Sequence, residues 1–389
     1  MLWVWLAACR PGVDLDRDGW TNNEDCDDND PMLNLDDADG DGFDTCAGDC
    51  DDADPQRWDQ VGTFDGTPSG DELAELCSNF CVRTVTGDVT IEGEVPPVLD
   101  CLSAVEGSLT VQNVDQLTEL VALENLAEVG RDVAIRGNPR LERVPGLGGL
   151  TTIGGDLEID DNPNLATLDG FSALTSLGGS VLVSASTQLV DLTGLGALDE
   201  VPGDLVLASL VSVNPLGGLD QLSVVGGTLE LRGLARIIEV PPLGVSVGGL
   251  RIVDNPALES IVGLAFTIFG EDGLAIEGNP ALVNLTGLGS LSEIPGPITL
   301  RNNALQSLDG LSALTNTGGA LTIDGEVALQ DLSGLDNLTF VGGDLRVTNG
   351  GSLQRLDGLG ALTAVDGDLD LLGNGALSSL TGLATVGSV

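Results

Sequence analysis

The stretch Gly155-Asp156-Leu157-Glu158-Ile159-Asp160-Asp161-Asn162-Pro163-Asn164-Leu165 decides the fold, because its pattern recurs along most of the chain. Its apolar-x-apolar core returns roughly 13 times at intervals of about 24 residues, a period typical of solenoids. The copies begin at Val89, Leu109, Val133, Leu157, Val181, Leu205, Leu229, Leu250, Leu274, Ile298, Leu321, Leu345 and Leu369. Each copy therefore predicts one coil, stacked on the coil before it.

Within one copy, the two-residue alternation predicts a strand. Leu157 and Ile159 point inward while Glu158 and Asp160 point outward. The next copy continues a parallel sheet at a spacing of about 4.8 Å, so the coils form a rod on the order of 60 Å long. We expect a mainly β fold, a right-handed parallel β-solenoid of about 13 turns of about 24 residues.

Two recurring positions mark the corners of the coil. A glycine stands just before most strands, as at Gly154 and Gly178, where a corner needs a positive φ or close backbone approach. An asparagine falls five places after the first strand residue and predicts a stacked ladder bonded to the backbone at the next corner. The ladder residues are Asn138, Asn162, Asn255, Asn279, Asn303 and Asn374.

Composition excludes several classes of function. The 389 residues carry 61 acidic and 14 basic side chains, a net charge of −47, and about 22 of the acidic residues lie between Asp14 and Glu75. Nucleic acid is not an expected partner, because no basic stripe is present to release counterions. The chain has no His, Lys or Tyr, which removes most general bases and the Ser-His-Asp and Ser-Lys arrangements.

The N-terminus carries the apolar run Leu6-Ala7-Ala8-Cys9. This run resembles a bacterial lipobox, and the resemblance implies a signal-like segment at residues 1–9 and lipidation of Cys9. It also implies an extracytoplasmic location, at a bacterial outer membrane or cell surface. No other stretch has the 18 or so consecutive apolar residues of a membrane span, so we expect membrane attachment only through lipid. The alternative is a chance apolar N-terminus.

Residues 10–60 contain two acidic loops with calcium-ligand spacing. The first loop would bind through Asp14, Asp16, Asp18, the Trp20 carbonyl, Asn22 and Asp25. The second would bind through Asp37, Asp39, Asp41 and Phe43, with Asp49 or Asp51 completing the shell because Gly48 holds its twelfth place. Carboxylates without histidine favour Ca²⁺ over copper or zinc. The alternative is an acidic, disordered linker.

The doublets around these loops, Asp25-Cys26-Asp27-Asp28-Asn29-Asp30-Pro31 and Asp49-Cys50-Asp51-Asp52-Ala53-Asp54-Pro55, carry a resemblance confined to this segment. They resemble the MopE-type metal-binding repeat and the thrombospondin type 3 calcium repeats. The resemblance implies Ca²⁺ as the bound ion.

Residues 61–80 read as a linker and a capping helix. Ser69 and Glu72 form a capping box, and apolar residues follow it at one-face spacing up to Phe80. We expect this helix to cover the open end of the first turn. Cys81 and Cys101 each stand six residues before a corner glycine, so equivalent places on adjacent turns predict a disulfide between them. The pairing of Cys26, Cys46, Cys50 and Cys77 stays open.

Residues 81–389 form the solenoid. The segment Leu99-Asp100-Cys101-Leu102-Ser103-Ala104-Val105-Glu106-Gly107-Ser108-Leu109 and the Gly-Leu-x-x-Leu coils resemble the receptor L domains of the insulin and epidermal-growth-factor receptors. This leucine-rich-repeat-like resemblance covers residues 77–389 and implies the fold. It hardly bears on the ligand, because the array has more turns than a single L domain.

The outward face of the long sheet is the expected binding surface. It has a less polar patch near the middle of the rod. The candidate binding face consists of Glu158, Asp160, Leu182, Val206, Glu230, Arg232 and Arg251. The alternative is an ordinary solvated sheet whose opposite charges stabilise it modestly. No Trp or Tyr supplies an anchor on this face.

These features favour a non-catalytic cell-surface lipoprotein, a calcium-stabilised adhesion or ligand-binding module whose ligand is an unknown protein or glycan. The alternatives are a polysaccharide-cleaving β-helix enzyme that uses paired carboxylates and a passive structural spacer. At the C-terminus, we expect Val389 to align with Leu369 and to be the first residue of another strand. We expect edge-to-edge self-association or fraying at that turn, or else a longer reading frame.

Overall fold

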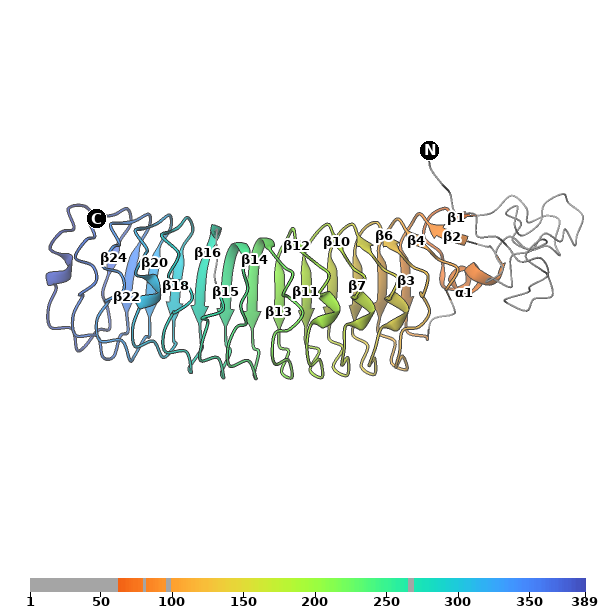
Figure 1. Ribbon diagram of the computed structural model, residues 1–389, viewed down its shortest axis with the longest axis horizontal. Coiled ribbons are helices and arrows are strands. Elements are labelled where there is room, and N and C mark those ends of the chain that lie inside the picture. The colour runs from red at the N-terminus through yellow and green to blue at the C-terminus, as the bar shows by residue number, and fades with distance from the viewer. Residues whose placement is uncertain (1–61, 80–81, 96–98, 265–268) are drawn as a thin grey trace, which may run out of the picture.

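The computed structural model describes residues 62–79, 82–95, 99–264 and 269–389, and shows a mainly β, parallel solenoid of about 12 turns. The coils follow one another along a single long axis, from β1 (Gly62–Phe64) and α1 (Gly70–Asn79) at one end to β24 (Leu369–Asp370) at the other (Figure 1). The predicted solenoid is confirmed. The turn count is about 12 rather than about 13, because a turn runs from one strand to the next.

The longest sheet is parallel and has 14 strands, which the alternating apolar residues produce by pointing into the solenoid. Leu157, for example, is fully buried and lies between Val133 and Val181 of the adjacent strands. The strands are β3 (Val89–Glu92), β5 (Leu109–Gln112), β7 (Val133–Arg136), β9 (Leu157–Asp160), β11 (Val181–Ser184), β12 (Glu200–Val201), β13 (Leu205–Ala208), β14 (Val224–Arg232), β15 (Ser246–Val253), β16 (Phe269–Glu277), β18 (Ile298–Arg301), β20 (Leu321–Asp324), β22 (Leu345–Thr348) and β24.

Shorter parallel strands form a second side of the coil. A six-stranded sheet contains β1, β2 (Val82–Val85), β4 (Ala104–Val105), β6 (Glu128–Val129), β8 (Thr152–Ile153) and β10 (Ser176–Leu177). A four-stranded sheet contains β17 (Glu293–Ile294), β19 (Asn316–Thr317), β21 (Phe340–Val341) and β23 (Ala364–Val365). The expected alignment of Val389 with Leu369 is wrong, because Ser388 forms a parallel bridge with Ala364 of β23, so Val389 is in register with Val365 on this second side. Between them, the long strand β14 pairs with β12 through Val224 and Val225 and with β13 further on, so it takes part in both sides.

Single turns of 3-10 helix lie on the third side and bring large apolar residues into the core. They are η2 (Pro145–Leu147), η3 (Asp169–Phe171), η4 (Thr193–Leu195), η5 (Asp309–Leu311) and η6 (Thr381–Leu383). In η3, Phe171 is fully buried. A Cβ at Gly170 would lie 1.9 Å from the Val144 carbonyl oxygen of the preceding coil, so only glycine allows this close stacking.

The corner before the long sheet also requires close backbone approach. A Cβ at Gly154 would lie 2.1 Å from the carbonyl oxygen of Gly130, its equivalent in the preceding turn. Gly154 does not adopt a positive φ. Of the two reasons that predicted glycine here, close approach is therefore the one that applies.

The predicted asparagine ladder is confirmed. The Asn162 side chain accepts a hydrogen bond from the Asn138 backbone N–H at 3.2 Å and donates to the Ile135 carbonyl at 2.7 Å. Asn138, Asn162, Asn255, Asn279 and Asn303 are all buried, and Asn374 makes the same type of bond to the Val347 carbonyl at 2.6 Å. The ladder satisfies backbone groups that the corner would otherwise leave buried and unpaired.

The predicted capping helix is confirmed as α1. Its capping box forms, with the Ser69 backbone N–H donating to the Glu72 carboxylate at 2.7 Å. That bond, together with one from the Ser69 hydroxyl group, lowers the pKa of Glu72. Leu73 and Leu76 are buried against the first turn, so the helix contributes apolar side chains to the N-terminal end of the core.

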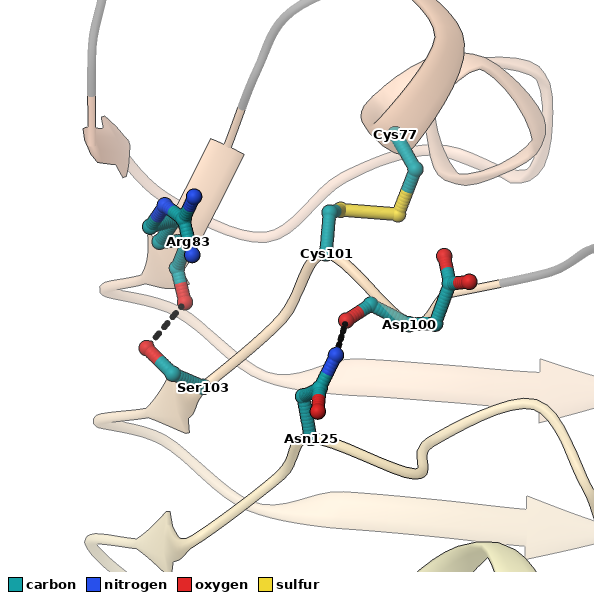
Figure 2. Close-up of a disulfide and its surroundings, with 6 residues drawn as sticks. All are labelled: Cys77, Arg83, Asp100, Cys101, Ser103 and Asn125. Atoms are coloured by element: carbon teal, nitrogen blue, oxygen red, sulfur yellow. Dashed lines mark hydrogen bonds between the residues drawn. A yellow bond between two sulfur atoms is a disulfide. The ribbon is translucent and has the colours of Figure 1, made fainter. Parts of the chain in front are cut away.

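The predicted disulfide between Cys81 and Cys101 is wrong, because Cys101 is bonded to Cys77 instead (Figure 2). The two Cα atoms lie 5.4 Å apart across a sequence separation of 24, one repeat length. Helix α1 turns Cys77 toward the core beside Leu76, so the helix, and not the stacked coil, supplies the partner. Cys81 itself lies outside the described residues.

Candidate binding face

The outward side chains of the long sheet form two columns, as the strand registers show. The first contains Thr90, Thr110, Ala134, Glu158, Leu182, Val206, Glu230, Arg251, Ala275, Thr299, Thr322, Arg346 and Asp370. The second contains Gln112, Arg136, Asp160, Ser184, Ala208, Arg232, Val253, Glu277, Arg301, Asp324 and Thr348, with Glu92 before them. All seven residues of the predicted binding face lie in these columns.

Toward the N-terminal end, the face carries one polar cluster. Arg136 lies 3.4 Å from the Glu158 carboxylate and donates to the Gln112 side chain at 3.0 Å. Asp160 accepts a hydrogen bond from the Ser184 hydroxyl group. Each group therefore has a partner on an adjacent turn, at the spacing that a parallel sheet provides.

A second cluster is centred on Glu230. Its two carboxylate oxygens lie 3.1 Å from Arg232 and 3.2 Å from Arg251. The Glu230 side chain is only 17% exposed, whereas the two arginines are about half exposed. The arginine head groups thus reach solvent while their shared carboxylate lies beneath them.

Between the two clusters lies a less polar patch made of Leu182, Val206 and Ala208. Leu182 pairs in register with Val206, and these two lie between Glu158 and Glu230 in the same column. Ala208 is almost fully buried although it lies in an outward column, so it exposes almost no surface of its own. Figure 1 shows β11 and β13 near the middle of the rod.

A third cluster, not included in the predicted face, surrounds Arg301 further along the rod. Arg301 lies 3.3 Å from Glu277 and 3.2 Å from Asp324. Hydrogen bonds from Asn349 and Thr348 are the main cause that lowers the pKa of Asp324, and the Arg301 charge adds to them. The alternating charges of this third cluster could be predicted from the sequence, but the contact of Asn349 with Asp324 depends on the geometry of the corner.

The structure also contains features that the repeat pattern did not predict. The peptide bond between Asn214 and Pro215 is cis, and a shallow hollow beside it is lined by Asn214, Pro215, Ile238, Glu239 and Pro241. The available signal was the displacement of this Asn-Pro pair. In the consensus, as at Asn162-Pro163, the pair begins two residues after the end of the strand, whereas Asn214 stands six residues after the end of β13.

The predicted calcium ligands and the predicted lipidation site at Cys9 lie outside the described residues. Within the described ranges, no group of three or more acidic or sulfur-bearing side chains is arranged to hold a metal ion. No helix in those ranges is long and apolar enough to span a bilayer.

Comparison with known proteins gives no family for the chain. No protein-family model matches it, and no curated protein matches its sequence.

Proposed function

We propose that the chain is a non-catalytic binding or adhesion module at a bacterial cell surface, stabilised by calcium and anchored by a lipid on Cys9. The observation that carries this proposal is the long sheet, whose outward side chains keep constant register over about 12 turns. Such a surface can hold many weak contacts in a fixed geometry, and this suits an extended protein or glycan ligand.

The part of the face between Glu158 and Arg251 has the layout of an interaction surface. Leu182 and Val206 form an apolar centre, and ion pairs lie on both sides of them. Protein interfaces typically have an apolar core and a polar rim. The arginines can exchange water for ligand groups while Glu158 and Glu230 keep them oriented.

Catalysis is the less favoured alternative. A glycoside-cleaving pair needs two carboxyl groups about 5 to 9.5 Å apart on either side of the substrate bond, one of them with a raised pKa. Glu158 and Asp160 are already paired with Arg136 and Ser184 and lie in the outward columns of the sheet. The remaining alternative is a passive spacer, in which these pairs serve only the fold.

The calcium part of the proposal rests on the spacing of Asp14, Asp16, Asp18 and Asp25. Calorimetric titration of the full chain with Ca²⁺ should show one or two sites and added resistance to protease. Exchange of Asp16 and Asp18 for Asn should remove the first site and leave the solenoid folded. A titration without heat or protection would leave only an acidic linker.

The binding proposal is tested with glycan and protein arrays probed by the calcium-loaded full chain. We expect a restricted set of ligands, bound without any turnover of glycan. Uniform absence of binding would favour the spacer, and product release from a polysaccharide would favour the enzyme.

A further inference from the structure

One carboxyl group is built into the asparagine ladder. In the C-terminal half of the rod, the side chains of Asn255, Asn279 and Asn303 form a directed series of hydrogen bonds. Asn255 Nδ2 donates to Asn279 Oδ1 at 3.2 Å, and Asn279 Nδ2 donates to Asn303 Oδ1 at 3.0 Å. Along the series, each side-chain amide thus donates one hydrogen bond to the next ladder side chain on its C-terminal side.

Glu326 occupies the next position of this series. Its side chain is about 1% exposed. Oε1 accepts from the Asn303 backbone N–H at 3.1 Å and from Asn303 Nδ2 at 2.8 Å, and Oε2 accepts from the Leu305 N–H at 3.3 Å. The equivalent position in the following turn is Gly350, which has no side chain to continue the series.

The strand register also indicates which backbone carbonyl group is the equivalent acceptor for Glu326. Each asparagine donates to the carbonyl group two places into the preceding strand, as Asn279 does to Ile252 and Asn303 does to Ile276, at 2.9 and 2.8 Å. By the strand register, the equivalent carbonyl group for Glu326 is that of Leu300. A neutral carboxyl group can donate to it as the amides do, whereas a carboxylate can only accept.

The charges around Glu326 do not compensate a carboxylate there. Asp324, two residues earlier, adds a negative charge, and Arg301 is already held by Asp324 and Glu277. The following turn presents Thr348, Asn349 and Gly350 at this corner, none of them charged. Burial raises the pKa of Glu326, and it outweighs the bonds from Asn303 and Leu305.

We propose that Glu326 is a proton-binding lock in the solenoid: its neutral carboxyl group completes the ladder, and release of the proton to solvent loosens the coils from β18 to β22. A carboxyl group that binds its proton more tightly in the fold than in the unfolded chain stabilises the fold fully at low pH. That contribution is lost as the pH rises through the folded-state value.

The composition of the chain makes this behaviour measurable. The chain has no histidine, and among the described carboxyl groups with a shifted pKa only that of Glu326 is raised, whereas those of Glu72, Asp324 and Asp331 are lowered. Ordinary Asp and Glu residues are fully ionised above about pH 6. A pH dependence of the described coils above the range in which ordinary carboxyl groups titrate therefore reports on Glu326, whose raised pKa places its titration higher.

Native-state hydrogen exchange on the full chain tests the lock, with rates corrected for the intrinsic pH dependence of exchange. Protection in β18, β20 and β22 should fall with rising pH, by at most tenfold per pH unit because one proton is involved. Protection in β7, β9 and β11 should stay constant. The variant Glu326→Gln should remove the pH dependence, and Glu293→Gln, at an exposed position of a neighbouring turn, should retain it.

An unchanged pH dependence in Glu326→Gln would overturn the proposal, as would constant protection of β18 to β22 in the wild-type chain. If Glu326→Gln does not fold, the wild-type comparison of β20 with β9 still decides. Equal behaviour of these two strands contradicts the lock.

Discussion

At the residue scale, each coil requires one residue with a left-handed backbone conformation just after its strand in the long sheet. Glycine fills the position at Gly93, Gly137, Gly233, Gly278, Gly325 and Gly373, with positive φ values. In the other turns the same position holds Asn113, Asp161, Ala185, Ser209, Asp254, Asn302 and Asn349, with φ between 49° and 56°. Asn and Asp tolerate this conformation, but the Cβ of Ala185 is strained in it.

Ala185→Gly should therefore raise the free energy of unfolding by about 0.5 to 1 kcal/mol, because relief of strain exceeds the added freedom of glycine in the unfolded chain. Urea denaturation measures the change. The reverse exchange Gly137→Ala should destabilise, since φ is +63° and the added Cβ would lie 2.8 Å from Asn113 Oδ1. A less stable Ala185→Gly variant would show that the corner is not strained.

The ladder leads to a second residue-scale prediction. Asn279→Ala removes the hydrogen bonds that it accepts from the backbone N–H and side chain of Asn255 and the one that it donates to the Ile252 carbonyl, all at buried positions. We expect a loss of about 2 to 4 kcal/mol in the free energy of unfolding.

Asn164→Ala is the matched control for the ladder. Its side chain donates to the Pro139 carbonyl at 2.7 Å but is exposed, so water can replace the bond. We expect a loss below about 1 kcal/mol in the same urea titration. Equal losses in the two variants would mean that burial does not strengthen the ladder.

At the element scale, the strands were predictable because their two-residue alternation is local and repeats in register. Leu157 and Ile159 are buried as expected, and the outward columns follow directly. The continuous strands β14, β15 and β16 were not predicted, since their pairing through both sides arises from contacts between coils. The role of Glu326 in the ladder was also not predicted, because the repeat pattern has asparagine at this position and Glu326 departs from it.

The N-terminal end shows the same limit of sequence reasoning. Ser69 and Glu72 predicted α1, because a capping box is a local signal. The disulfide partner depended on how the helix lies over the first turn. Near the disulfide, Asn125 donates to the Asp100 carbonyl at 2.7 Å and Ser103 donates to the Arg83 carbonyl at 3.2 Å (Figure 2). These two hydrogen bonds fix the backbone on both sides of Cys101.

Cys77→Ser should lower the free energy of unfolding of the N-terminal coils by about 3 kcal/mol, because the disulfide closes a loop about one repeat long. Protease nicking near α1 should increase, with the coils around β20 unaffected. Peptide mapping without reductant should recover Cys77 linked to Cys101. Recovery of Cys101 linked to Cys81 would contradict the observed pairing.

At the scale of the whole molecule, the middle of the rod departs from the consensus on several sides at once. Leu210 and Leu234 replace the ladder asparagines, and the cis peptide before Pro215 alters a later part of the same coil. The outward face carries Leu182 and Val206 in this same middle part of the rod. These departures leave the stacking intact, so the period of about 24 residues predicts the architecture but identifies no ligand.

The measurement that tests the central claim most directly is ligand binding by two matched double variants of the full chain. The first variant, Leu182→Arg with Val206→Arg, places two charges in the less polar patch. The second variant, Thr299→Arg with Thr322→Arg, adds the same charge to the same column further along the rod. Binding of an array-selected ligand should fall at least tenfold in the first variant and stay within about twofold in the second. Full binding by the first variant, or equal loss in both, would contradict a binding face between Glu158 and Arg251.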